Sequence, residues 1–151
     1  MAISTDAAIE FYGTQDDVSN SSSSVVDGAF SVSGDVSNWT NDDDAPMAIA
    51  ILECAYATAP DASSTVDLFT RLIDIIGTDD ADAPDADNLH IYLGTFPLNN
   101  VTTRQHIPIE ISLPNSETSQ IHQFYIQNNG GQTMSASWQL HITPKAIGPH
   151  A

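Results

Sequence analysis

Strict alternation of apolar and polar residues near the C-terminus restricts the fold of this chain more than any other feature of its sequence. The apolar positions of one such stretch are Met134, Ala136, Trp138, Leu140 and Ile142, each followed by a polar residue. Ile107–Leu113 alternates in the same way. Successive side chains of a β-strand point to opposite faces, so a period of two predicts strands with one buried face. The pattern therefore predicts a β protein with Trp138 in its core.

Eight apolar stretches, separated by residues that favour turns, predict an all-β fold of about eight strands. They are Ala7–Tyr12, Val25–Val32, Met47–Tyr56, Val66–Ile76, Leu89–Phe96, His106–Leu113, Ile121–Gln127 and Met134–Thr143. Short strands with this punctuation are typical of β-sandwiches, including jelly rolls. The length of 151 residues fits one domain, so we expect a single jelly-roll-like sandwich over residues 1–151. Residues 1–24 are a candidate extended N-terminal arm.

Local features suggest how some of these strands pair. Met47–Tyr56 begins apolar on both faces, as expected of a central strand. Pro108 has no N–H to donate, which places its strand at an edge or in a bulge. The turn residues Asn128–Gln132 predict a hairpin between Ile121–Gln127 and Met134–Thr143.

The stretch Val66–Ile76 fits two secondary structures. Val66, Phe69 and Ile73 recur at helical spacing, after a serine that resembles a helix cap. Its β-branched residues and its alternation with Arg71 favour a strand. We expect a strand and keep the helix as the alternative.

The charge balance argues against several classes of partner. Twenty acids face three bases (Arg71, Arg104 and Lys145), for a net charge of −17. Such a chain lacks the cationic surface that nucleic acids and anionic membranes require. No targeting or membrane-spanning segment is predicted, and the single cysteine, Cys54, allows no intrachain disulfide. The acid excess suits either a high-salt environment or a protein placed outside a packaged polyanion.

The acidic run Asp79–Asp87 is the one candidate metal site. Carboxylates in alternating positions suit calcium, and the candidate ligands are Asp80, Asp82, Asp85 and Asp87. The run lacks a mid-loop glycine and a terminal bidentate glutamate, and Pro84 interrupts it. We therefore expect a solvated acidic loop and no cofactor, with bound calcium as the alternative.

Residue types that carry catalysis are present without a recognisable arrangement. Glu53 and Glu110 lie in predicted strands and could form the carboxylate pair of a glycosidase, but nothing else indicates a sugar cleft. His90, His122 and His141 fall in three strands and could meet across a sheet, without metal-ligand spacing. The sequence predicts a protein that is not an enzyme.

Aromatic and aliphatic residues in polar surroundings indicate a protein interface. Trp39 lies in the polar stretch Ser37–Asn41, where it is either a plug over one end of the sandwich or an interface hot spot. The predicted interface residues are Ile3, Ile9, Phe11, Tyr12 and Trp39.

Three segments resemble small virion structural proteins of tailed bacteriophages. They are Asp43–Ala50 before a long strand, Leu89–Phe96 after an acidic loop, and Gln123–Pro144 with its turn and proline-stopped strand. The resemblance covers Trp39 to the C-terminus. It implies a non-enzymatic β-sandwich on the capsid surface of the virion, which decorates or cements the shell as a homo-oligomer bound to the major capsid protein.

Two other functions remain open at this stage. One is a neck- or tail-associated virion β-sandwich. The other is a carbohydrate-binding module that uses exposed tyrosines and tryptophans with a calcium ion in the Asp79–Asp87 loop.

Overall fold

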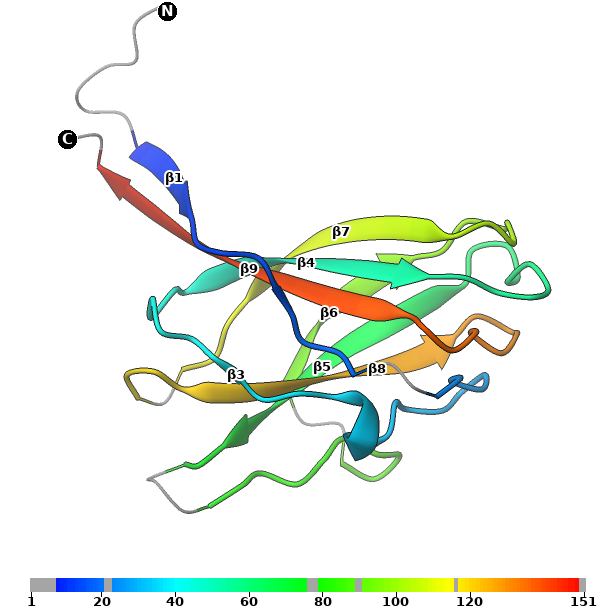
Figure 1. The fold of residues 1–151 in the computed structure, drawn as a ribbon, viewed down its shortest axis with the longest axis horizontal. Coiled ribbons are helices and arrows are strands. Elements are labelled where there is room, and N and C mark those ends of the chain that lie inside the picture. Colours follow the sequence, from blue (N-terminus) through cyan, green and yellow to red (C-terminus); the bar gives the residue numbers. More distant parts are fainter. Residues whose placement is uncertain (1–7, 21–22, 76–78, 89–90, 116, 150–151) are drawn as a thin grey trace, which may run out of the picture.

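The computed structural model describes residues 8–20, 23–75, 79–88, 91–115 and 117–149, which form two antiparallel β-sheets with one core between them (Figure 1). The strands are β1 (Ala8–Tyr12), β2 (Asp16–Asp17), β3 (Trp39–Thr40), β4 (Met47–Cys54), β5 (Thr65–Ile73), β6 (Ile91–Pro97), β7 (Gln105–Ser112), β8 (Ile121–Asn129) and β9 (Gln139–Pro149). A single 3-10 turn, η1, spans Ser33–Asp35. The all-β prediction is confirmed.

The strand order is that of a jelly roll. The five-stranded sheet runs β1–β9–β4–β7, with β2 also paired to β9, and the four-stranded sheet runs β3–β8–β5–β6. Because β1 and β2 both pair with β9, they are two pieces of one interrupted strand. Counted this way, eight strands lie in two sheets of four, the arrangement of a double-sheet jelly roll. The predicted jelly-roll-like sandwich of about eight strands is confirmed.

The core lies between the two sheets and follows from the alternation in each strand. In β4 every second residue is fully buried, from Ala48 to Cys54. Phe96 and Phe124 face these residues from the four-stranded sheet, and each buried side chain of this size contributes about 1.5–3 kcal/mol. Trp138 is 1% exposed, and its Nε1 donates to the Ser23 carbonyl oxygen at 3.2 Å. Its predicted place in the core is confirmed.

The ambiguous stretch Val66–Ile76 is a strand as far as Ile73, and Asp74 follows with φ 54°. β5 pairs with β6 and β8, and its register to β6 shifts between Leu68 and Phe69. β5 is apolar on both faces, which explains the helix-like spacing in the sequence. Successive residues point to opposite sides, so Leu68 packs into the main core and Phe69 into a separate cluster with Tyr125.

The predicted hairpin between Ile121–Gln127 and Met134–Thr143 is wrong. β8 and β9 belong to different sheets, so the chain crosses the sandwich between them. The turn itself is present, with Gly131 at φ 72°. β9 begins only at Gln139, because Ser137 turns the chain at φ 69° and Ala136 faces solvent. Met134 remains buried, held by isolated bridges to Val25 and Tyr56.

Val25–Val32 does not form the predicted strand. Its strand-like pairing is limited to isolated bridges at Val25 and Phe30, although further backbone hydrogen bonds tie the stretch to β8. A turn at Asp27–Gly28, with Gly28 at φ 76°, interrupts the stretch and prevents a continuous ladder.

Prolines mark the limits of pairing in the five-stranded sheet. β7, with Pro108, is an edge strand, and β4 lies between β9 and β7, as predicted for both. β9 passes through Pro144 instead of stopping there. The Pro144 carbonyl oxygen accepts from Gly13 N at 2.9 Å, so the missing N–H faces the break between β1 and β2, where no ladder bond is needed.

The candidate N-terminal arm is part of the sheet where the structure describes it. β1 and β2 pair with β9, and Val18 is 2% exposed in the main core. The described portion of residues 1–24 is therefore paired with the sheet through β9.

Candidate interaction surface

β1 and the end of β9 leave the body of the sandwich as a two-stranded ribbon (Figure 1). Ala8–Tyr12 pairs with Lys145–Pro149, and β4 reaches only as far along β9 as Lys145. Phe11, Tyr12 and Ile147 on this ribbon are 53%, 56% and 56% exposed. A two-stranded ribbon alone is marginally stable in water, and exposed aromatic residues are typical of interfaces. We call this pair of segments the β1–β9 ribbon.

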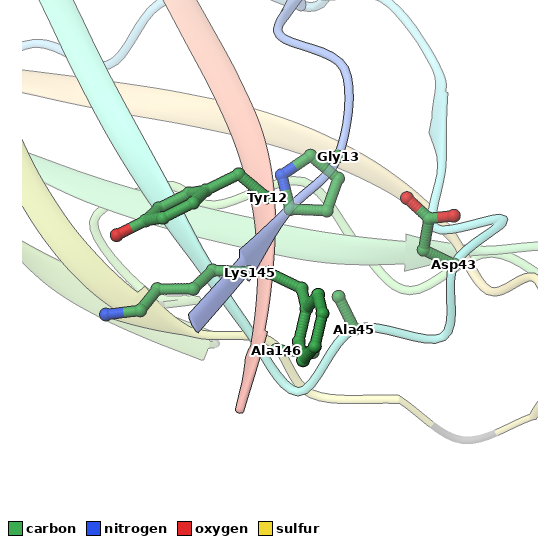
Figure 2. A pocket seen from close by; sticks show the side chains of 8 residues that line it. Tyr12, Gly13, Asp43, Ala45, Lys145 and Ala146 are labelled. Carbon is green, nitrogen blue, oxygen red and sulfur yellow. The ribbon is translucent and has the colours of Figure 1, made fainter. Parts of the chain in front are cut away.

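A lysine anchors the ribbon to the sandwich. Lys145 Nζ lies 2.7 Å from Glu10 Oε1 on β1 and 2.5 Å from Glu110 Oε2 on β7. It also lies 5.9 Å from the centre of the Tyr12 ring, and the Tyr12 hydroxyl donates to Glu10 Oε2 at 2.7 Å. These hydrogen bonds raise the pKa of Lys145, and the bond from Lys145 lowers the pKa of Glu10. Figure 2 shows the Tyr12 and Lys145 side chains extending in the same direction, away from Asp43.

A pocket of about 250 Å³ lies where the ribbon meets the sandwich (Figure 2). It is lined by Phe11, Tyr12, Gly13, Asp43, Ala45, Pro144, Lys145 and Ala146. Gly13 permits the close approach of the chain here, because a Cβ at this position would lie 2.6 Å from Asp43 Oδ2. The pocket has the size of one or two side chains.

The predicted interface residues divide between the ribbon and the core. Phe11 and Tyr12 are exposed on the ribbon, Ile9 is partly exposed, and Ile3 lies outside the described residues. Trp39 is only 5% exposed and belongs to the main core. The structure therefore corrects the predicted interface position of Trp39. It favours the alternative, in which Trp39 is a plug over one end of the sandwich.

The polar neighbours of Trp39 made its burial hard to recognise from the sequence. Its Nε1 donates to Asp16 Oδ2 at 2.9 Å, so the indole has a polar partner at the surface end. Its rings pack against His122 and Phe124, with centroids 5.7 and 5.8 Å away. Asn41, two residues later, is also buried, with its side-chain amide bonded to both backbone groups of Ala45. The polar stretch is a tightly hydrogen-bonded plug.

The four candidate calcium ligands are exposed and serve local hydrogen bonds where these are described. Asp80 Oδ1 accepts from Asp74 N, and Asp85 Oδ1 accepts from the N–H groups of Asp87 and Asn88. No group of three or more acidic, histidine or cysteine side chains among the described residues could hold a metal ion. Asp82 and Asp87 lie on the same exposed loop.

The histidines and glutamates singled out by sequence do not assemble into one site. His122 lies in the four-stranded sheet and His141 in the five-stranded sheet, so these two do not meet across one sheet. His90 lies outside the described residues. Glu110 forms an ion pair with Lys145. Glu53 lies opposite His106 on β7, four residues from Glu110, so the two glutamates are about 13 Å apart along the strand.

Glu53 is the centre of a cluster that the sequence analysis missed. Its carboxylate lies 2.5 Å from Arg104 Nη1, 3.6 Å from His106 Nε2 and 3.8 Å from His141 Nε2. Only the register of β4 with β7 and β9 brings these side chains together. Cross-strand alternation could have placed them on one face, but the sequence does not specify which strands are neighbours.

Comparison with known proteins adds no assignment: neither a protein-family model nor a curated protein matches this chain. Within the described ranges, no helix has the length and apolar character needed to cross a membrane.

Proposed function

We propose that this chain is a non-enzymatic structural protein of a tailed-phage virion, which binds the major capsid protein and stabilises the outside of the shell as a homo-oligomer. The observation that carries the proposal is the β1–β9 ribbon, with its exposed Phe11 and Tyr12 beside an open pocket. These side chains are the kind that anchor protein interfaces. Jelly rolls are also frequent among viral capsid domains, although a fold alone does not assign a function.

The charge of the chain supports a position outside the shell. A net charge of −17 repels packaged DNA and directs binding toward protein. Binding that occurs only on the assembled shell stabilises it by RT ln(1 + [L]/Kd) per site. Many weak contacts over a capsid lattice add up to resistance against internal pressure.

Rebinding to depleted shells tests the proposal. Virions of the source phage are stripped of this chain, incubated with purified variants and pelleted, and the bound chain is quantified. We expect wild-type protein to co-sediment and the double variant Phe11→Ala/Tyr12→Ala to bind at least about thirtyfold more weakly, as loss of a hot spot of 2 kcal/mol does. Tyr92→Ala is the matched control, since Tyr92 is 55% exposed on β6, which belongs to the other sheet.

The results separate the alternatives. If wild-type protein does not co-sediment at any salt concentration, decoration of the capsid is wrong and a neck or tail position takes its place. If wild-type protein and the double variant bind equally, the capsid function stands and the ribbon is not its attachment surface.

A further inference from the structure

The pocket at the base of the β1–β9 ribbon lies on the core side of β9. Leu140 and Ile142 point into the core, so alternation turns Pro144 and Ala146 to the same side of the strand. Phe11 is the cross-strand partner of Ala146, which places its side chain on this side as well. The pocket thus continues the apolar side of the sandwich beyond its buried part.

Lys145 also lines this pocket, but its charge lies on the other side of the ribbon. Its cross-strand partner is Tyr12, and its Nζ is held between the carboxylates of Glu10 and Glu110. In Figure 2 the Lys145 and Tyr12 side chains extend away from Asp43. The lysine of the pocket is therefore engaged elsewhere and does not balance the charge of Asp43.

Asp43 places a carboxylate at the edge of this apolar pocket. It is exposed, in the turn between β3 and β4. Its Oδ2 comes within 2.6 Å of the place where a Cβ on Gly13 would stand, and the Pro144 ring comes within 3.2 Å of the same place. Among the described residues, no hydrogen bond or ion pair engages the Asp43 carboxylate. Such a pocket suits a cation carried on an apolar stem.

The charge around the pocket favours a cation. A second hollow, of about 210 Å³, adjoins the pocket and shares Asp43 and Pro144 with it. Asp16 and Asp42 line this second hollow, so three carboxylates surround the two. The positive charge of Lys145 is already balanced by its two glutamates. The resulting field attracts a cationic group and repels a carboxylate or a phosphate.

We infer that this pocket receives an arginine side chain of a protein partner, with the guanidinium on Asp43 and the stem against Phe11 and Pro144. The inference rests on the proposed function, in which the partner is the major capsid protein. The planar guanidinium stacks on aromatic rings and binds a carboxylate through two parallel hydrogen bonds, which lysine cannot do. Phe11 is 53% exposed and offers such a ring. Arginine is also enriched at protein interfaces, whereas lysine is depleted.

A second copy of this chain is a poor source of the arginine. The chain has three bases. Arg104 is paired with Glu53, and Arg71 donates to Gln123 and to the acidic loop. Lys145 belongs to the pocket itself. Docking of either arginine from a second copy would break its contacts within that copy, so the pocket fits a different and more basic protein.

Binding of a small probe tests the inference in the absence of shells. Amide spectra of the ¹⁵N-labelled protein are recorded at constant ionic strength during titration with N-acetylarginine methylamide. The citrulline analogue, which has nearly the same shape and no charge, is the control probe. We expect saturable shifts at Gly13, Ala45 and Ala146 with the arginine probe, and binding of the citrulline probe at least about fivefold weaker, as for the loss of one ion pair.

Variants separate the pocket from the overall charge of the chain. Asp43→Asn should weaken binding of the arginine probe at least about fivefold. Asp87→Asn, which removes the same charge from the exposed acidic loop, should leave the binding unchanged. Gly13→Ala keeps the charge but displaces the Asp43 carboxylate, so it should weaken binding as well. Absence of shifts at the pocket, or equal affinity for the two probes, or equal affinity of wild type and Asp43→Asn, would overturn the inference.

Rebinding to shells distinguishes a failure of this inference from a failure of the proposed function. If wild-type protein and Asp43→Asn co-sediment with shells equally well, the inference is wrong and the capsid function stands. If the arginine probe binds as expected and wild-type protein does not bind shells, the capsid function is wrong, and the pocket takes its arginine from another protein.

Discussion

The indole of Trp39 packs against the imidazole of His122, with ring centroids 5.7 Å apart, and the two residues are direct cross-strand partners of β3 and β8. His122 also stacks on Phe124, with an angle of 10° between the ring planes, and is fully buried. Nδ1 of the imidazole lies 3.3 Å from Thr70 Oγ1, and Nε2 lies 3.3 Å from Asn115 Oδ1. Burial lowers the pKa of His122 to about 4.

The lowered pKa of His122 predicts that the protein loses stability in mild acid. The unfolded chain binds this proton below about pH 6.5, whereas the folded chain binds it only below about pH 4. The free energy of unfolding should therefore fall as the pH drops through this window, by about 2 kcal/mol between pH 7 and 5. Urea midpoints at the two pH values measure it for wild type and His122→Asn.

The variant His122→Asn should be less stable at pH 7 and should show a flatter pH dependence. His106→Gln is the control at a histidine whose side chain is exposed. An equal slope in wild type and His122→Asn would show that another group titrates.

Replacement of Trp39 should act on folding and not directly on attachment. Trp39→Ala should lower the free energy of unfolding by about 3–5 kcal/mol, as loss of a large buried aromatic side chain does. Trp39→Phe keeps a ring and loses the bond to Asp16, which should cost about 1 kcal/mol. Chemical denaturation measures both, and Asp16→Ala should add little to Trp39→Phe if the bond is the only interaction between them. A Trp39→Ala variant of wild-type stability would place the ring outside the core.

Local patterns in the sequence predicted strands well, and the pairing of strands less well. Alternation predicted β7 and the first part of β9, as far as Thr143, because burial of one face is recorded in consecutive residues. The turn at Gly131 was recognised, but the sheet that the chain joins next depends on the distant contacts of Met134 with Val25 and Tyr56. Local turn chemistry holds no information about those contacts.

The same limit applies to the candidate surface. Phe11 and Tyr12 stood out as aromatic residues in a polar segment, and both are exposed. The contacts of Lys145 with Glu10 and Glu110 join three strands, so they follow only from the register. Trp39 was predicted at an interface because its neighbours are polar. In the structure these neighbours include Asn41, which is buried and hydrogen-bonded within the chain, and the composition of a segment does not distinguish buried polar residues from exposed ones.

The acidic loop should not bind calcium tightly. Asp85 Oδ1 accepts two backbone N–H groups, and Asp80 Oδ1 accepts another from Asp74, so these oxygens already stabilise turns. Titration calorimetry with calcium should detect no stoichiometric binding stronger than about 10 μM, the range of sensor sites. Asp85→Ala should loosen the loop, seen as faster amide exchange at residues 87 and 88, with or without calcium. A tight site that Asp85→Ala abolishes would contradict this assignment.

Cys54 should react with thiol reagents only when the five-stranded sheet opens. It is the only cysteine, lies at the end of β4 and is fully buried, and burial raises the pKa of its thiol to about 12. At pH 8 about one-quarter of a free cysteine is thiolate, the reactive form. For a thiol with this pKa the thiolate fraction is at least about a thousandfold smaller. Ellman's reagent should therefore modify the native protein at least a thousandfold more slowly than the urea-unfolded chain, which should give one thiol per molecule at once.

The variant Ile109→Ala, which weakens β7, is a positive control. Its faster opening should raise the rate of modification without changing the final number of thiols per molecule. Rapid modification of the native wild type would mean that the end of β4 is accessible and that the sheet opens locally without global unfolding.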